Sequence, residues 1–219
     1  MNLQETREAL KSVFTTRLST SYAKLFNDKV DIDEDLITIL QEYVSCGGII
    51  EKGSSFEFSQ QMLEQRGIRL PKQIHDQEHY IDENKVISYN DALQRNSNLT
   101  LEQLRNMIDN YFLAKEEYGS GDIESRLTNM KEYVECGGIL SDYIDNSLYE
   151  QLRESSENYF QYSDTYQNII TQSKENQSSR NLEQSQLQGL KAEHLKLETE
   201  NDNLSTELSK YEKTNEIGE

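Results

Sequence analysis

Apolar residues recur at intervals of three and four along most of the chain, which is the spacing of one face of an α-helix. The helices that this pattern predicts span residues 3–26, 34–46, 54–66, 100–118, 123–136 and 143–171. Residues 68–99 lack the periodicity, and within them only residues 85–89 have the composition of a short strand. The sequence therefore predicts an all-α fold whose helices each bury one apolar face.

A string of eleven residues occurs twice, at 40–50 and again at 130–140, with an offset of 90 residues. Seven of the eleven positions are identical, and both copies contain the sequence Tyr-Val-x-Cys-Gly-Gly-Ile. Each copy predicts a helix that ends at its glycine pair, because glycine adopts the left-handed conformation of many helix ends without steric cost. The predicted helix C-caps are Gly47, Gly48, Gly137 and Gly138.

The repeated string and the apolar pattern together predict the order of domains. Two related helical units should pack together, since each helix is too apolar on one face to stand alone. The expected segments are a duplicated helical domain over 1–165 (units at about 1–67 and 100–165, joined by an irregular acidic connector, 68–99), a helix or polar linker over 166–186, a coiled coil over 187–213 and a disordered tail over 214–219.

A short leucine zipper occupies the last part of the chain. With Leu190 placed at position d of a heptad, apolar residues fill most of the a and d positions. The predicted partner-binding seam consists of Leu187, Leu190, His194, Leu197, Asn201, Leu204, Leu208 and Tyr211. Asn201 lies at an a position, where a single polar residue fixes register and oligomeric state.

The positions that flank this seam are mostly acidic. In a parallel homodimer Glu193 would face Glu198 of the second copy, and Glu207 would face Glu212. Because these pairs repel, a heteromer is expected rather than a homodimer. The predicted partner is another protein chain with a basic or mixed-charge coiled coil. The region before the zipper lacks the strongly basic helix of basic-zipper transcription factors.

The charge of the chain narrows the function further. Its 219 residues carry a formal net charge of −18, which repels phosphate backbones and anionic lipid surfaces. Direct binding to nucleic acid and insertion into a membrane are therefore not expected, and no secretory signal or membrane-spanning run is visible. Two cysteines are too few for a disulfide framework. An intracellular location is expected, in either the cytoplasm or the nucleus.

One string offers a catalytic alternative. Residues 75–79, His-Asp-Gln-Glu-His, match the pattern H-x-x-E-H of inverted zinc proteases. On a helix His75 and His79 could bind zinc, with Glu78 as the general base. However, the string follows Pro71 in the least periodic part of the chain, and no helix with a third ligand is evident. We therefore expect no enzyme activity, no metal and no cofactor.

The function that these patterns favour is a non-enzymatic structural or adaptor subunit of a multiprotein complex, which pairs with its partner through the C-terminal coiled coil. A second hypothesis is an adaptor with two peptide-binding sites, because duplicated units predict two equivalent sites for one ligand. The third is a zinc-dependent hydrolase that uses His75, Glu78 and His79.

Overall fold

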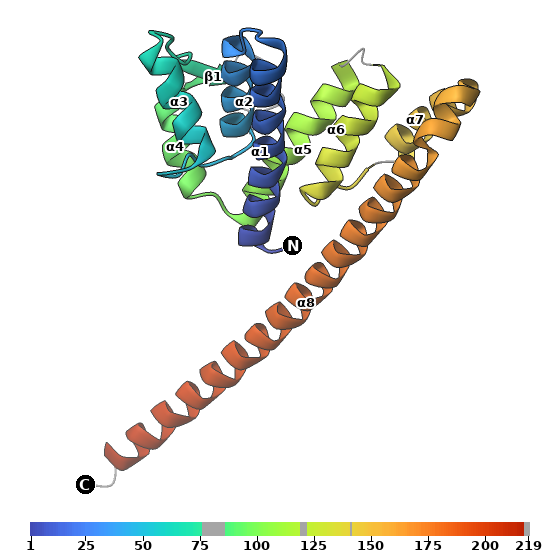
Figure 1. Cartoon of the computed structure of the whole chain (residues 1–219). Helices are drawn as coiled ribbons and strands as arrows, with labels where there is room; N and C mark the ends of the chain where they lie inside the picture. Colours follow the sequence, from blue (N-terminus) through green and yellow to red (C-terminus); the bar gives the residue numbers. More distant parts are fainter. Residues whose placement is uncertain (76–85, 119–121, 141, 217–219) are drawn as a thin grey trace. The chain divides into compact units, whose positions relative to one another are not determined.

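The computed structural model of the chain describes residues 1–75, 86–118, 122–140 and 142–216. Two compact units are present, a helical domain (Met1–Asn176) and a C-terminal segment (Gln177–Glu219). Helices dominate, which confirms the predicted all-α fold (Figure 1). Their bounds are α1 (Leu3–Asp28), α2 (Asp33–Ser45), α3 (Ser55–Gln65), α4 (Tyr89–Ser97), α5 (Leu101–Tyr118), α6 (Ile123–Glu135), α7 (Asp142–Glu154) and α8 (Ser156–Glu216).

The described parts of the predicted connector (68–75 and 86–99) contain regular structure, including a strand within residues 85–89, where the sequence predicted one. Strands β1 (Gln73–His75) and β2 (Val86–Ser88) form an antiparallel pair. Helix α4 follows directly, and the side chain of Ser88 caps it by accepting a hydrogen bond from the backbone N–H of Asp91 at 3.0 Å. The apolar pattern missed α4 because the helix is short and two of its three buried residues are an alanine and an asparagine.

The C-terminal helices also differ from the prediction. Residues 143–171, expected to form one helix, divide at Ser155 between α7 and α8. The carbonyl of Ser155 accepts the first hydrogen bond of α8, from the backbone N–H of Tyr159 at 2.8 Å. Helix α8 then continues through residues 166–186 and includes residues 214–216, which were assigned to a disordered tail.

Helices α1–α4, here called the N-terminal half, and helices α5–α8, the C-terminal half, share several local features. Each half opens with a helix whose first turn is closed by reciprocal hydrogen bonds, between Asn2 and Glu5 in α1 and between Thr100 and Gln103 in α5. Helix α1 packs along α2, and α5 packs along α6. Helix α1 also contacts α5 and α6, so the two halves share an interface within the helical domain.

The main hydrophobic core lies at this interface between the halves. Its largest fully buried side chains include three phenylalanines, from α1, α3 and α5: Phe14, Phe56 and Phe112. Tyr43 of α2 stacks on Phe56 with ring centroids 4.0 Å apart. A second core joins α6 and α7 to the first turns of α8. The members of both cores occupy apolar faces that the sequence pattern assigned to these helices.

Candidate functional sites: two capped Gly-Gly turns, a charge cluster and an exposed seam

The two copies of the repeated string adopt the same geometry. Helix α2 ends in a turn in which Gly47 has a φ of 91°, and α6 ends in a turn in which Gly137 has a φ of 86°. In the first turn the N–H of Gly48 donates to the carbonyl of Tyr43 at 2.8 Å, and the equivalent bond in the second turn measures 2.9 Å. This pattern satisfies the last carbonyls of both helices.

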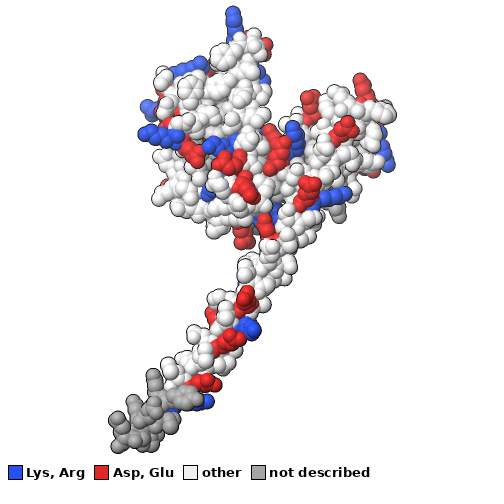
Figure 2. All heavy atoms as spheres, turned by 60° about the horizontal axis from the view of Figure 1, so that its bottom comes forward, with Lys and Arg blue, Asp and Glu red and all other residues white. Residues whose placement is uncertain are grey.

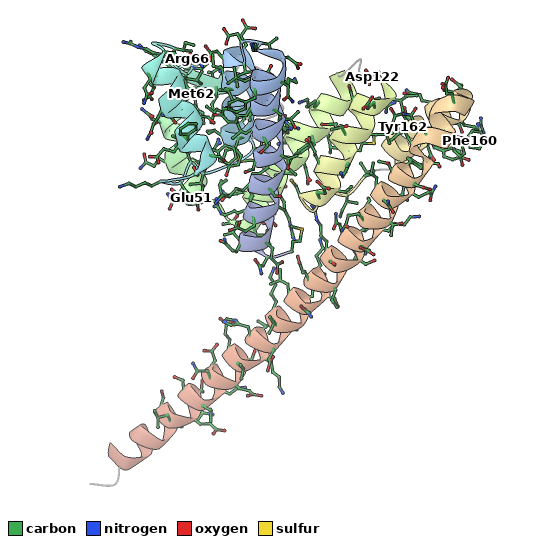
Figure 3. The ribbon with its side chains drawn as sticks, in the orientation of Figure 1. Glu51, Met62, Arg66, Asp122, Phe160 and Tyr162 are labelled. Atoms are coloured by element: carbon green, nitrogen blue, oxygen red, sulfur yellow. The ribbon has the colours of Figure 1, made fainter. Side chains whose placement is uncertain are left out.

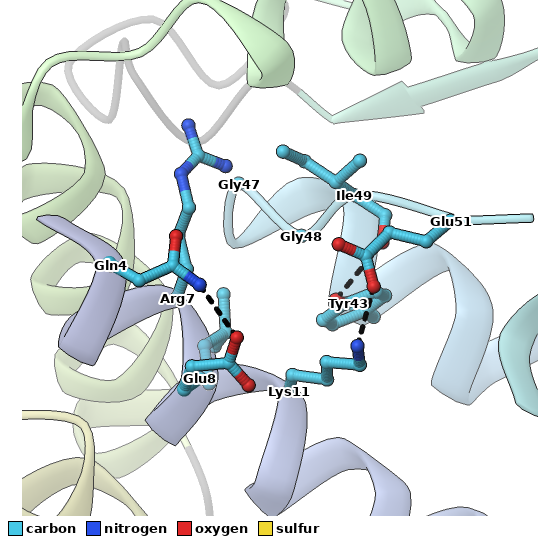
Figure 4. Close-up of a pocket in the computed structure, with 10 residues that line it drawn as sticks. Gln4, Arg7, Glu8, Lys11, Tyr43, Gly47, Gly48, Ile49 and Glu51 are labelled. Atoms are coloured by element: carbon cyan, nitrogen blue, oxygen red, sulfur yellow. Dashed lines mark hydrogen bonds and ion pairs between the residues drawn. The ribbon is translucent and has the colours of Figure 1, made fainter. Parts of the chain in front are cut away.

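The tyrosine of each string packs over the turn that follows its helix. The hydroxyl of Tyr43 donates to the carbonyl of Ile49 at 3.2 Å (Figure 4). The hydroxyl of Tyr133 lies 3.3 Å from the carbonyl of Ile139, but a carboxylate oxygen of Asp109 is its closer acceptor, at 2.9 Å. Burial raises the pKa of Tyr43 to about 12, so this hydroxyl keeps its proton at neutral pH. Each ring lies flat against the second glycine, and a Cβ on Gly48 would overlap the ring of Tyr43.

A buried asparagine caps each turn, and this contact was not anticipated from the sequence. The side-chain amide of Asn96, in α4, donates to the carbonyls of Val44 and Gly48 at 2.7 and 2.8 Å. Asn176, in α8, makes the same pair of bonds to the second turn at 2.9 and 2.8 Å. The offset between the two asparagines is 80 residues rather than 90, so an alignment of the repeated string alone does not reveal them.

Neither turn offers a reactive group. Cys46 and Cys136 precede the glycines and are both buried. Burial raises the pKa of both thiols, so they stay protonated and poorly nucleophilic at neutral pH. Beside the first turn there is a cavity of only about 40 Å³, whose lining includes Lys11 and Glu51, an ion pair at 2.5 Å. The four glycines therefore act as structural helix ends.

A cluster of charges joins the two halves around Arg17 of α1. Its guanidinium donates to Glu132 of α6 through two nitrogens, to Glu42 of α2 at 2.8 Å and to the hydroxyl of Tyr111 at 2.9 Å. Burial disfavours charge on Arg17, but the hydrogen bond that it donates to Glu132 and the neighbouring groups raise its pKa, so the side chain is permanently charged. The guanidinium also lies over the ring of Phe14, 4.5 Å from its centroid.

The two halves contribute equivalent residues to this cluster. Glu42 and Glu132 occupy the same position of the repeated string, and each opening helix carries a basic residue three positions after a buried phenylalanine, Arg17 in α1 and Lys115 in α5. Each cation contacts the glutamate of the other half, and Lys115 lies 3.3 Å from Glu42. The cluster lines a surface depression of about 850 Å³. Because its charges pair with one another, it fastens the halves together.

The predicted zipper seam lies on α8, in the C-terminal segment. Five leucines of the seam are each between 51% and 65% exposed: Leu187, Leu190, Leu197, Leu204 and Leu208. His194 and Asn201 are exposed as well, and Nδ1 of His194 lies 3.5 Å from a carboxylate oxygen of Glu198. Tyr211 belongs to the same helix, but its side chain lies outside the described residues. Acidic side chains recur along this segment (Figure 2).

The candidate zinc motif is not assembled in the part of the chain that the structure describes. His75 ends strand β1, where its backbone pairs with Val86, and Glu78 and His79 lie outside the described residues. Among the side chains that are described, no group of three or more His, Cys, Asp or Glu residues is arranged to hold a metal ion. Over the same residues, no helix is both long and apolar enough to cross a membrane.

Comparison with known proteins gives no further assignment. No family model matches the chain, and neither the curated proteins nor the solved structures compared with it provide a match. Function is therefore inferred from the residues and contacts of the chain itself.

Proposed function

We propose that the chain is a non-enzymatic structural or adaptor subunit of a multiprotein complex, and that it pairs with a helix of another protein chain through α8. The observation that carries this proposal is the row of five exposed leucines between Leu187 and Leu208 at coiled-coil spacing. Burying a leucine side chain fully is worth roughly 1.5–3 kcal/mol. Such a row therefore supplies a driving force for association that the isolated helix leaves unused.

The helical domain has a different task in this proposal, which is to anchor the N-terminal part of α8. The first turns of α8 contribute Tyr166 and Ile169 to the second core, and Asn176 fastens the helix to the end of α6. A partner helix bound to the seam is thereby attached to the folded domain through one continuous helix. This is the arrangement of an adaptor, in which binding and anchoring are separate regions of a single element.

The two alternative functions receive less support from the described residues. An adaptor with two equivalent peptide sites requires two similar grooves. The depressions beside α2 and α6, of about 440 and 240 Å³, have unlike linings, with Gln73, Ile74 and Val86 in the first and Thr165, Asn168 and Ile169 in the second. A zinc-dependent hydrolase requires a helix that carries both histidines, whereas His75 belongs to a strand.

Affinity purification of the tagged full chain tests the proposal. The double substitution Leu197→Asp with Leu204→Asp removes two neighbouring d positions, and we expect it to abolish recovery of the partner protein. Leu195→Asp is the matched control, because Leu195 is 65% exposed on the same helix but lies at position b, away from the seam. Circular dichroism should show that both variants keep the helical domain folded. Recovery of the same proteins with the double variant would contradict the proposal.

A further inference from the structure

The seam of α8 extends beyond the zipper. When the heptad frame is continued backward from Leu187, its a and d positions are first Glu183 and Arg180 and then six residues between Tyr159 and Asn176. These six are Asn176, Ser173, Ile169 and Tyr166, which are buried, and Tyr162 and Tyr159, which are partly buried against the second core. Phe160, labelled in Figure 3, lies at position b, outside this stripe, and its side chain is 82% exposed. One stripe therefore runs along the helix in a single register.

The N-terminal part of this stripe, as far as Asn176, is already occupied by the helical domain. The hydroxyl of Ser173 accepts a hydrogen bond from the backbone N–H of Leu140 at 2.9 Å, and Asn176 caps the turn after α6. Tyr166 and Ile169 lie in a core with Leu127 and Leu148 of α6 and α7. A partner helix cannot use these positions without displacing the domain.

On the C-terminal side of Asn176 the stripe is first polar and then consists of exposed leucines. The next two seam positions are Arg180 and Glu183, which offer a partner no apolar contact, and the first leucine of the seam is Leu187. From Leu187 to Tyr211 the available seam spans about 37 Å of helix at 1.5 Å per residue. The surface that a partner helix can use thus begins at Leu187, because Arg180 and Glu183 precede it.

The flanking charges specify what can bind there. The four described glutamates at e and g positions are Glu193, Glu198, Glu200 and Glu207, and Lys191 is the single basic residue at these positions between Leu187 and Leu208. In a parallel homodimer Glu193 would face Glu198, and in an antiparallel one g positions face g positions, which are again mostly glutamates. A second copy of the chain is therefore a poor occupant in either orientation.

We propose that residues 187–211 bind one parallel helix of a different chain, with Lys or Arg facing the four glutamates and an acidic or neutral residue facing Lys191. An asparagine of this partner pairs with Asn201, because a buried asparagine at a is best matched by another. The apolar contacts of the partner end at Leu187, since Arg180 and Glu183 are polar and the domain occupies the stripe as far as Asn176. This inference rests on the proposed function and adds to it the charge, orientation and extent of the partner helix.

Two synthetic peptides of about 28 residues test the charge of the partner. Both carry Leu at a and d and an Asn opposite Asn201. The basic peptide has Lys at e and g, with Glu opposite Lys191, and the control peptide has Glu at all of these positions. Titration calorimetry with the full chain should give about 100-fold tighter binding of the basic peptide at low salt, since four attractive pairs replace four repulsive ones. The difference should shrink at high salt.

The outcomes separate this inference from the proposed function. Equal binding of both peptides, lost in the chain with Leu197→Asp and Leu204→Asp, would overturn the charge assignment but support the seam. Failure of both peptides, with self-association of the chain that the same substitutions abolish, would show that a second copy is the occupant. Failure of both peptides without self-association would overturn the proposed function itself. Leu195→Asp should leave binding of the basic peptide unchanged in every case.

A longer peptide tests where the footprint ends. The basic peptide extended by two heptads would lie opposite residues 173–186. It should bind the full chain with the same affinity within about twofold, because the domain already occupies Ser173 and Asn176 and the next two seam positions offer no apolar contact. If the added heptads instead tighten binding by about tenfold or more, the partner displaces the domain from α8 and the proposed boundary is wrong.

Discussion

Helices α4 and α8 make the same capping contact in the two halves but differ in length. Each presents one asparagine to the carbonyls at the end of a repeated helix, with nearly identical distances. Helix α4 ends at Ser97, directly after its capping residue Asn96, whereas α8 continues from Asn176 to Glu216. The short helix demonstrates that the capping contact needs no extension. The capping contact therefore does not account for the residues of α8 beyond Asn176, which carry the exposed leucines on which the proposed function rests.

The two halves also differ in how their shared geometry is embedded. The two Gly-Gly turns have nearly the same φ angles and the same backbone hydrogen bonds, which depend on residues of the repeated string itself. Their surroundings come from other elements: among the described residues, a Cβ on Gly47 would meet Leu99, Leu104 and Met107, whereas a Cβ on Gly137 would meet Met1. Local sequence thus sets the turn, and the rest of the chain sets how much a change in the turn costs. Four pairs of substitutions test this distinction.

The largest effect is expected at the second glycine of each turn. Gly48→Ala and Gly138→Ala each place a Cβ inside the space of a buried tyrosine ring, and we expect each to lower the free energy of unfolding by about 3 kcal/mol. The two losses should be similar, because the clash is within the repeated string. Urea unfolding measures both. Gly189→Ala, which has open space around it, is the control and should cause no loss. Unequal losses would mean that the surroundings matter even here.

The next largest effect concerns the two equivalent cations. Arg17→Met leaves Glu132 without its bidentate partner in a site where both side chains are at most 16% exposed, and we expect a loss of about 3 kcal/mol. Lys115→Met removes the corresponding contact, but Lys115 is 44% exposed, so a loss of less than about 1 kcal/mol is expected. Urea unfolding of both variants provides the measurement. Equal losses would contradict the unequal burial of the two ion pairs.

The asparagine caps rank third. Asn96→Ala and Asn176→Ala each remove two hydrogen bonds to buried carbonyls, and we expect each to lower the free energy of unfolding by about 2 kcal/mol. Asn98→Ala, on an exposed side chain of the same region, should stay within about 0.5 kcal/mol of the wild type. Thermal and urea unfolding followed by circular dichroism measure these changes. A neutral Asn176→Ala would show that α8 does not depend on this cap.

The sequence predicted those features that depend on local pattern. The apolar stripes located five helices of the domain, and the glycine pairs located two turns whose first glycines have positive φ. It could not locate contacts whose partners are distant in sequence. The amide of Asn96 meets Val44 only because α4 folds back on α2, and Arg17 meets Glu132 only after α1 packs on α6. A polar residue on an apolar stripe, as Asn96 and Asn176 both are, is the signal that could have found the caps.

The smallest effect, and the finest test of the comparison, lies at the first glycine of each turn. Gly67→Ala serves as the reference, because Gly67 has a φ of 78° and open space, so its loss of about 1 kcal/mol reports the left-handed conformation alone. Gly137→Ala should match it, since its near neighbour is the sulfur at the flexible end of Met1, 3.0 Å away. Gly47→Ala should cost more, because its Cβ would lie 2.6 Å from Cδ1 of the fully buried Leu104. Urea unfolding of the three variants decides the order. If Gly137→Ala is the costliest, the packing of the repeated turns against their neighbours has been assigned to the wrong half.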